Sequence, residues 1–231
     1  HNNPKCYYGD MFERDKYVRQ RYQKYQEFLK FYLQPGVKVL DIGGYRGELK
    51  AFLPDDVDYY VLDFDKNALG QAHLVGAYVK ELNFDEGEIS WDGEKFDIIV
   101  ATEVLEHLKD PVRHLEEIKK ILKDQGVLLV SLPNENMLYH RLMALFGFGV
   151  DYFAFRLYKH LHLPTINQSR RFLQTQFKII KEDYYINVGA QTSRFEFLGK
   201  IFTLIPDAFW NFLAHLWPSG FARGTIFLCK K

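Results

Sequence analysis

The sequence is poor in cysteine and has no excess of charge of either sign. Its 231 residues include two cysteines, Cys6 and Cys229, and 30 basic residues balance 30 acidic ones. Because no CxxC pair and no Cys/His pair has the spacing of a metal site, we expect two free thiols in a reducing compartment. The balanced charge gives no electrostatic reason for a nucleic-acid partner, since phosphate binding requires clustered positive charge.

The chain also lacks a long hydrophobic run. No apolar stretch reaches the ~18 residues that a transmembrane helix requires. The most apolar candidate, residues 137–155, is interrupted by His140, Arg141 and Asp151. No secretory signal is visible either. We therefore expect a cytoplasmic protein without a transmembrane segment.

Short apolar runs alternate with helical patterns through the first part of the chain. The runs predict strands at 37–42, 58–65, 77–82, 95–101 and 127–133. Helical spacing predicts helices at 16–36, 47–53, 66–75 and 110–126, the last of them ended by Gly126. This alternation predicts βαβ units and a parallel α/β sheet, and the continuously apolar strands predict helices on both of its faces.

The remainder of the chain predicts a different arrangement. A short helix is expected at 169–176 and an apolar helix at 195–217, with strands at 177–186 and 224–230. These two strands lie far apart in the sequence, which permits antiparallel pairing at the edge of the sheet.

A glycine-rich turn, DIGGYRG at residues 41–47, follows the first predicted strand. Such a turn after a strand is typical of a backbone loop around a nucleotide-like ligand. The G-x-G-x-x-G spacing of dinucleotide sites is absent, because Tyr45 and Arg46 separate Gly44 from Gly47. A nicotinamide-dependent oxidoreductase is therefore the weaker alternative.

An acidic residue supports a ribose-containing ligand. Asp63 stands at the end of the second predicted strand, and an acid at this place commonly accepts hydrogen bonds from ribose hydroxyls. Asp65 is the alternative for the same task.

Four segments together carry a family resemblance: VLDIGGYRGEL (39–49), YYVLDFD (59–65), FDIIVATEVLEHLKDP (96–111) and GVLLVSLPN (126–134). Over roughly residues 36–135 the chain resembles a class I S-adenosylmethionine (SAM)-dependent methyltransferase of the ubiquinone/menaquinone-biosynthesis type, a methyltransferase type 11-like protein. The FD…EVLEHL…DP run is the most specific part. A weaker similarity continues in YKHLHLPT (158–165) and in the C-terminal LWPSGFARGTIFLCKK.

The resemblance implies a fold as well as a cofactor. It implies a Rossmann-like, seven-stranded, mostly parallel sheet with helices on both faces, whose last strand is inserted antiparallel between the fifth and the sixth. We expect one methyltransferase domain over residues 1–231. It would comprise an N-terminal helical flap (1–35), a SAM-binding core (36–135) and an aromatic-rich helical cap (136–170 and 190–220).

By analogy with the family, the cofactor-binding residues follow the ends of the strands. Asp41, Gly43, Gly44 and Gly47 would line the methionine half of SAM, and Asp63 would hold the ribose.

The adenine end and the cover of the cofactor are implied by the resemblance in the same way. Glu81, or as second choice Asn83, would face the adenine amine. Thr102 and Glu103 would close over the ligand.

Tyr45 departs from the family pattern D-x-G-x-G-x-G, in which the middle glycine stands at this position. Glycine is favoured there because the backbone comes close to the ligand and because φ can be positive, a conformation that strains a tyrosine. We expect negative φ at Tyr45 and an intact SAM site. The alternative is a damaged pocket in a methyltransferase-like scaffold without turnover.

Methyl transfer from a sulfonium is an in-line displacement, and it needs a base only when the acceptor carries a proton. The candidate catalytic residues are His107 in EVLEHL, His160 in YKHLHLPT, and Glu103, with His162 and Tyr158 as lesser candidates. The HxH pair of His160 and His162 has no evident third ligand, so no metal is expected.

The acceptor is expected to be a small molecule, a lipid-like compound or a glycan, methylated at oxygen by family analogy. The aromatic-rich stretches at 137–158 and 195–221 have three explanations. They form helices that cover the sheet, a hydrophobic cap over a lipid-like acceptor, or a face on a membrane interface or partner. A helix that is apolar almost all round is normally buried, which favours the first. The sequence leaves the oligomeric state open.

Overall fold

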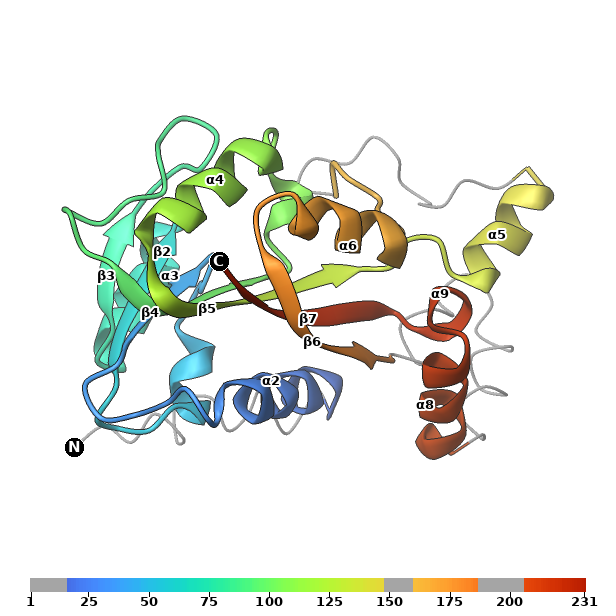
Figure 1. Ribbon diagram of the computed structural model, residues 1–231, viewed down its shortest axis with the longest axis horizontal. Helices are drawn as coiled ribbons and strands as arrows, with labels where there is room; N and C mark the ends of the chain where they lie inside the picture. The colour runs from blue at the N-terminus through green and yellow to red at the C-terminus, as the bar shows by residue number, and fades with distance from the viewer. Residues whose placement is uncertain (1–15, 148–159, 187–205) are drawn as a thin grey trace.

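The computed structural model describes residues 16–147, 160–186 and 206–231, and its centre is a seven-stranded sheet (Figure 1). The strands are β1 (Lys38–Ile42), β2 (Asp58–Asp63), β3 (Tyr78–Glu81), β4 (Phe96–Thr102), β5 (Leu122–Pro133), β6 (Lys178–Tyr185) and β7 (Gly224–Lys230). The helices are α2 (Lys16–Leu29), α3 (Lys66–Leu74), α4 (Pro111–Ile121), α5 (Leu138–Leu145), α6 (Ile166–Gln174), α8 (Asp207–Leu216) and α9 (Pro218–Phe221). Two short 3₁₀ helices, η1 (Glu48–Phe52) and η2 (Leu105–His107), follow β1 and β4.

The strand order is β3-β2-β1-β4-β5-β7-β6. The first five strands pair in parallel. β7 lies antiparallel to both of its neighbours, β5 and β6. The expected sheet, with its last strand inserted between the fifth and the sixth, is therefore confirmed.

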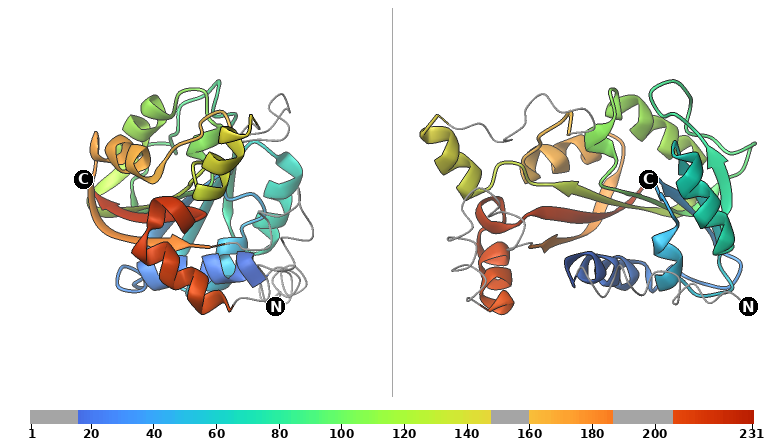
Figure 2. Two further views of the ribbon diagram at one scale, coloured as in Figure 1. Left: turned by 90° about the vertical axis from the view of Figure 1, so that its right-hand side faces the viewer. Right: turned by 180° about the vertical axis from the view of Figure 1, so that it is seen from behind.

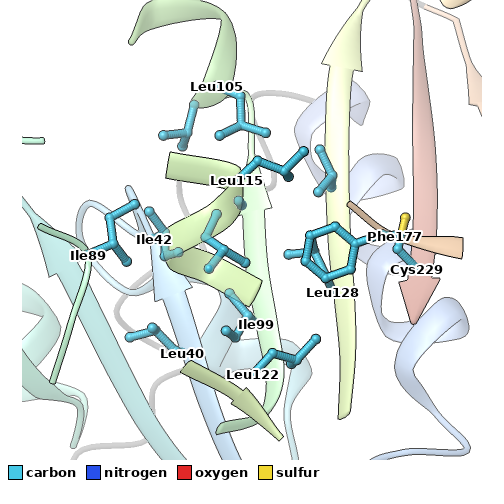
Figure 3. Close-up of a cluster of buried hydrophobic side chains, with 14 of the residues drawn as sticks. Leu40, Ile42, Ile89, Ile99, Leu105, Leu115, Leu122, Leu128, Phe177 and Cys229 are labelled. Atoms are coloured by element: carbon cyan, nitrogen blue, oxygen red, sulfur yellow. The ribbon is translucent and has the colours of Figure 1, made fainter. Parts of the chain in front are cut away.

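Helices cover both faces of this sheet, as Figure 1 shows: α4 and α6 lie on one side and α2 on the other. The α2 side buries residues of α2 and α3, such as Leu29 and Leu69, against Val61 and Val100. The α4 side buries Leu115 and its neighbours against the other face of the strands (Figure 3). Full burial of such a side chain contributes about 1.5–3 kcal/mol, so both layers hold the sheet in place.

The helix expected at 110–126 begins as predicted, because Pro111 is its first residue and the Asp110 side chain accepts from the Arg113 N–H. Its end was predicted wrongly: α4 stops at Ile121 and β5 starts at Leu122. Gly126 does not end a helix. It lies within β5, where an added Cβ would meet the Asp97 carbonyl oxygen at 2.9 Å. The glycine allows a close approach between β4 and β5.

Three other elements also differ from the prediction. The helix expected at 16–36 is α2, which ends at Leu29, well before Pro35 and Gly36. The helix expected at 47–53 is the shorter 3₁₀ helix η1. The helix expected at 169–176 starts earlier, at Ile166, because Thr165 and Gln168 form a capping box. This T-x-x-Q signal is visible in the sequence and marks a helix start.

At the far end of the molecule, α5, α8 and α9 lie beyond the carboxyl end of β5 (Figure 2). The expectation of a helix buried all round is wrong for α8, because Phe212 and Leu216 are 61% and 69% exposed. α5 likewise keeps Leu145 exposed. Residues 195–205 and Tyr158 lie outside the described part of the chain. Within the described part, no helix combines the length and the apolar character needed to cross a bilayer.

Candidate functional site

The glycine-rich loop after β1 is shaped by close contacts that exclude side chains. Gly43 has φ 68°, and a Cβ at this position would clash with the Val104 side chain. A Cβ on Gly44 would meet the Asp41 carboxyl at 2.8 Å. The loop thus packs directly on the segment that follows β4, and its backbone forms a cradle at the carboxyl edge of the sheet.

Tyr45 lies in this loop, directly after Gly44, and has φ 47°. The prediction of negative φ is therefore wrong. A left-handed conformation costs an ordinary residue roughly 1–2 kcal/mol. The Tyr45 N–H donates to Oδ2 of Asp63 at 2.9 Å. The ring is 41% exposed, with the Arg46 guanidinium 5.0 Å from its centre. The hydrogen bond from the tertiary structure, rather than local sterics, sets the backbone angle.

Asp63 ends β2 and is buried. Its second oxygen, Oδ1, accepts from the Asp65 N–H at 2.9 Å. Asp65 itself caps α3 by accepting from the N–H groups of Asn67 and Ala68. The two acids therefore have different tasks: Asp65 holds a helix, and Asp63 holds the glycine loop.

The residues expected at the adenine end lie next to Asp63 along the sheet edge. Glu81 pairs with Asp63 in the register of β2 and β3, and its side chain is exposed. Asn83 is also exposed, and its side-chain oxygen accepts from the Asp85 N–H at 3.1 Å. Because Asn83 is engaged in a local turn, Glu81 is the better placed of the two.

Asp41 lies beneath the loop rather than on its surface. It is buried, and its Oδ2 accepts from the Tyr59 hydroxyl at 2.7 Å. Burial raises the pKa of its carboxyl to about 7, and the charges of Glu48 and Asp63 add to the effect, whereas the bond from Tyr59 opposes it.

The residue that follows β4 is held by bonds from two other strands. β4 ends at Thr102, and Glu103 has φ 56°. Oε1 of Glu103 accepts from Ser131 Oγ at 2.8 Å and from the Tyr185 hydroxyl at 2.6 Å. Non-glycine residues with positive φ persist only where the surroundings enforce them, and such residues cluster at functional sites.

Helix α2 is tied to the same place. Arg21 lies 3.6 Å from Oε2 of Glu103, and the Tyr25 hydroxyl donates to Ser131 Oγ at 3.0 Å. Lys24 forms an ion pair with Asp183 of β6. These three contacts hold the N-terminal helix α2 against the carboxyl edge of β4 and β5.

Glu106, His107 and His160 bring their ligand atoms within 4.8 Å of one another, and we refer to them as the Glu106 cluster. His107 and His160 are ring neighbours, with centroids 4.7 Å apart. The segment after His160 is docked here by its backbone, because the N–H groups of Leu161 and His162 donate to the Glu106 carbonyl. The fold therefore unites His107 and His160, which are 53 positions apart in the sequence.

His160 is oriented by a carboxylate. Its Nδ1 lies 2.8 Å from Oε1 of Glu135, and its Nε2 lies 3.9 Å from Oε1 of Glu106. Burial alone would raise the pKa of the Glu135 carboxyl, but the bond with His160 and the charge of Arg223 outweigh it and lower that pKa. The Glu135 carboxylate accepts a hydrogen bond from the Nδ1–H of His160, and in this tautomer Nε2 is the acceptor nitrogen of the ring.

Glu106 is 1% exposed. Neither of its carboxyl oxygens has a hydrogen-bond partner among residues 16–147, 160–186 and 206–231. Burial raises the pKa of this carboxyl well above its ordinary value, and the charge of Glu103 raises it further.

A cavity of about 370 Å³ adjoins Glu106. Its lining is mostly apolar and includes Leu105, Leu132, Leu163 and Phe172. Ser169 also lines it, and its buried Oγ has no hydrogen-bond partner within the described ranges. The cavity is large enough for a small aromatic or aliphatic group.

The lesser candidate His162 lines the same cavity but does not join the Glu106 cluster, because its Nε2 lies 2.9 Å from the Leu108 carbonyl oxygen. The HxH spacing therefore does not form a metal pair. Glu106 and Glu135 were missed in the sequence. The signal for Glu135 was its place two residues after β5, since polar residues that follow parallel strands meet at one edge of the sheet.

Comparisons with known proteins bear on the family and the fold of the chain. A family model described as a methyltransferase domain matches residues 15–182. A ubiquinone biosynthesis O-methyltransferase from Actinobacillus pleuropneumoniae is 28% identical over 137 residues, which is 55% of this chain and 57% of the relative. A probable S-adenosylmethionine-dependent methyltransferase from Mycobacterium tuberculosis is 32% identical over 101 residues, which is 42% of this chain and 35% of the relative. The chain thus spans 57% of the length of the first of these curated relatives and 35% of the length of the second.

Solved structures share the fold at low sequence identity. A SAM-dependent methyltransferase from Thermotoga maritima, described as a possible histamine N-methyltransferase, has a TM-score of 0.60 at 15% identity, with 99% of each chain covered. The magnesium protoporphyrin IX methyltransferase from Synechocystis, solved with bound S-adenosylhomocysteine, has a TM-score of 0.60 at 14% identity, covering 93% of this chain and 84% of that one.

Proposed function

This chain belongs to the methyltransferase domain family, and we propose that it transfers a methyl group from SAM to an oxygen atom of a small-molecule, lipid-like or glycan acceptor. The family match covers residues 15–182 and supports SAM as the cofactor over a nicotinamide dinucleotide. When bound, SAM supplies an electrophilic methyl group on a sulfonium sulfur. The chain has to bind SAM, orient the acceptor and remove the acceptor's proton.

The loop after β1 fits a cofactor of this kind. Its glycines leave the backbone bare, because side chains at Gly43 and Gly44 would clash with Val104 and Asp41. Each oxygen of Asp63 accepts one backbone N–H, which leaves a second lone pair on each oxygen for ribose hydroxyls.

The observation that carries the proposal is the contact between this loop and the segment before the Glu106 cluster. Gly43 packs against Val104, and Glu106 follows two residues later. A cofactor cradle and the imidazoles of the Glu106 cluster therefore share one edge of the sheet. This arrangement suits a reaction in which methyl and acceptor meet at about 3–3.5 Å.

Oxygen acceptors suit this cluster because a hydroxyl carries a proton at neutral pH, and its removal favours attack. His160 supplies a lone pair at Nε2, held in position by the bond between Nδ1 and Glu135. With SAM bound, a lone pair of the acceptor oxygen would form the new bond to the methyl carbon, and the electron pair of the broken carbon–sulfur bond would stay on sulfur. The acceptor proton leaves through the Glu106 cluster. The curated relative from Actinobacillus, named an O-methyltransferase, supports the same atom.

The surroundings favour a lipid-like acceptor among the three classes. The cavity beside Glu106 is largely apolar, and α5 and α8 keep large apolar side chains exposed at the same end of β5. Apolar surface next to a reaction site is typical of a site for hydrophobic ligands or of peripheral membrane contact.

The test is release of S-adenosylhomocysteine from SAM with matched acceptors: catechols with and without a prenyl chain, sugar hydroxyls, and amines as the nitrogen control. We expect turnover with a hydroxyl acceptor. The His160→Ala variant should lower kcat by roughly 10²–10⁴-fold, the usual contribution of assisted proton removal, with unchanged SAM affinity by calorimetry. The matched control is His73→Ala, because that imidazole is exposed on α3 and does not line the cavity.

Methylation only of amines would refute the choice of oxygen. SAM binding without turnover on any acceptor would favour a methyltransferase-like scaffold without activity. The absence of SAM binding would refute the proposed activity.

A further inference from the structure

The three side chains of the Glu106 cluster offer the donor set of a transition-metal site. Among the residues that the structure describes, this is the group in which three such side chains converge, with all ligand atoms within 4.8 Å. Two imidazoles and one carboxylate are a common ligand set for catalytic Zn²⁺, which keeps a further position open. Metal–ligand bonds of about 2.0–2.2 Å place ligand atoms roughly 3.4 Å apart in a tetrahedron. The separation of 3.9 Å between His160 Nε2 and Glu106 Oε1 is close to this.

The surroundings of His160 match those of a metal ligand. A histidine that binds a metal almost always donates its other ring N–H to a carboxylate or carbonyl. His160 has this arrangement, because Nδ1 lies 2.8 Å from Glu135 Oε1 while Nε2 faces Glu106. Glu135 is buried and lies 3.8 Å from Arg223, so that it is itself fixed in place.

Glu106 gives independent support. A carboxylate buried without hydrogen bonds costs several kcal/mol, and both oxygens of Glu106 are buried without a partner in the described ranges. Two cations lie nearby, and each is close to another carboxylate: Arg21 lies 3.6 Å from Glu103, and Arg223 lies 3.8 Å from Glu135. Within the described ranges neither carboxyl oxygen of Glu106 has a hydrogen bond, and a bound cation would satisfy this carboxyl.

We propose that Glu106, His107 and His160 bind a divalent transition-metal ion, with Zn²⁺ as the best match and Glu135 as the positioning residue of His160. The two imidazole ligands favour Zn²⁺ and its first-row neighbours and disfavour Mg²⁺, which prefers oxygen ligands. Sequence spacing does not reveal this site, because His160 reaches the other two residues only through the tertiary fold.

The consequence for the reaction rests on the proposed function. An acceptor hydroxyl at the open position of the metal would lose its proton more readily, since a bound Zn²⁺ lowers the pKa of a coordinated water to about 7. With the metal bound, Nε2 of His160 would hold the ion and the acceptor proton would pass to solvent. The removal of the proton by His160 described under the proposed function would then apply to the metal-free chain.

The experiment measures metal binding without SAM or acceptor, so that its failure and the failure of methyl transfer remain distinct. Chelator-treated protein is titrated with Zn²⁺ by calorimetry and with Co²⁺ by visible absorption, with Mg²⁺ as the control ion. We expect one Zn²⁺ per chain in the cluster and a Co²⁺ spectrum of a four- or five-coordinate site.

Four variants locate the ion, with thermal unfolding as the check on folding. Glu106→Gln keeps the size of the side chain, and it should weaken Zn²⁺ binding more than the ~10–100-fold that loss of an outer-shell partner costs. His160→Ala should do the same. Glu135→Gln should fall within that ~10–100-fold range, and His162→Ala should bind as the wild type does.

Zn²⁺ binding that is equal in all four variants would place the ion elsewhere and overturn the proposal. The proposal is also overturned if the protein binds no Zn²⁺, or if Mg²⁺ binds as tightly. If the ion binds as expected but no acceptor is methylated, the site stands and the proposed function alone is contradicted.

Discussion

Replacing Asp41 with asparagine should remove a large pH dependence from the stability of the fold. Asp41 is buried in β1, where its carboxyl accepts from the Tyr59 hydroxyl at 2.7 Å. Burial raises the pKa of this carboxyl from the ordinary 3.8 to about 7 in the folded chain. The folded state therefore binds the Asp41 proton more tightly than the unfolded state does.

The sign and the size of the effect follow from this difference. An acid with a raised pKa contributes stability that is fully present below its unfolded value and is lost as the pH rises through about 7. At 1.36 kcal/mol for each pKa unit, the loss amounts to roughly 4 kcal/mol. For a domain of this size each kcal/mol corresponds to about 2–4 °C in Tm, so the loss is on the order of 10 °C.

The assay is thermal unfolding of wild type and Asp41→Asn between about pH 3 and pH 8.5, a range chosen to span the two pKa values. Asparagine has no proton to lose, so its stability relative to wild type should rise by roughly 4 kcal/mol across this range. Titrating groups that do not interact with Asp41 cancel in the difference. Tyr59→Phe is the informative companion, because it removes a bond that lowers the pKa of Asp41 and should extend the loss to higher pH. Parallel pH profiles for wild type and Asp41→Asn would refute the reasoning.

Two further predictions concern the glycine-rich loop. Tyr45→Gly relieves about 1–2 kcal/mol of left-handed strain but adds roughly 0.5–1 kcal/mol of chain entropy to the unfolded state. Stability and SAM affinity should thus change little, and a large gain in affinity by calorimetry would show that the tyrosine obstructs the site. Asp63→Asn removes a charged acceptor of two backbone N–H groups, worth about 1.5–3 kcal/mol, and should weaken SAM binding by roughly 10–100-fold. Asp65→Asn, whose side chain caps only α3, should leave SAM binding unchanged, and equal losses in both variants would contradict the division of tasks.

Much of the fold was predictable because its information is local. Apolar runs such as residues 37–42 and 58–65 form the strands β1 and β2. The cap at Asp110 and Pro111 starts α4 where the sequence predicts it. The place of β7 between β5 and β6 followed from the family resemblance, because strand spacing alone allowed only the antiparallel pairing of β6 and β7.

Predictions failed where the conformation or burial of a residue depends on contacts with residues far away in the sequence. Gly126 resembles a helix end, yet it serves the close approach of the Asp97 carbonyl. The segment that contains α8 is apolar enough to be buried, yet Phe212 stays 61% exposed, because α8 lies beyond the end of the sheet (Figure 2). Propensity and periodicity describe a segment, whereas these outcomes depend on what packs against it.

Some features of the candidate site were likewise visible in the sequence, and others appeared only in the tertiary structure. The sequence by itself determined the strands, the glycine loop, the acid at Asp63 and the resemblance to a methyltransferase, since neighbouring residues carry these signals. Only the tertiary structure decided the backbone angle of Tyr45, whose N–H is bound by Asp63 across 18 positions. It also decided that Glu106, His107 and His160 converge, with Glu135 behind His160. Folding brings such groups to one edge of the sheet because parallel strands end there together. The spacing of these residues in the sequence does not predict how close they lie in space.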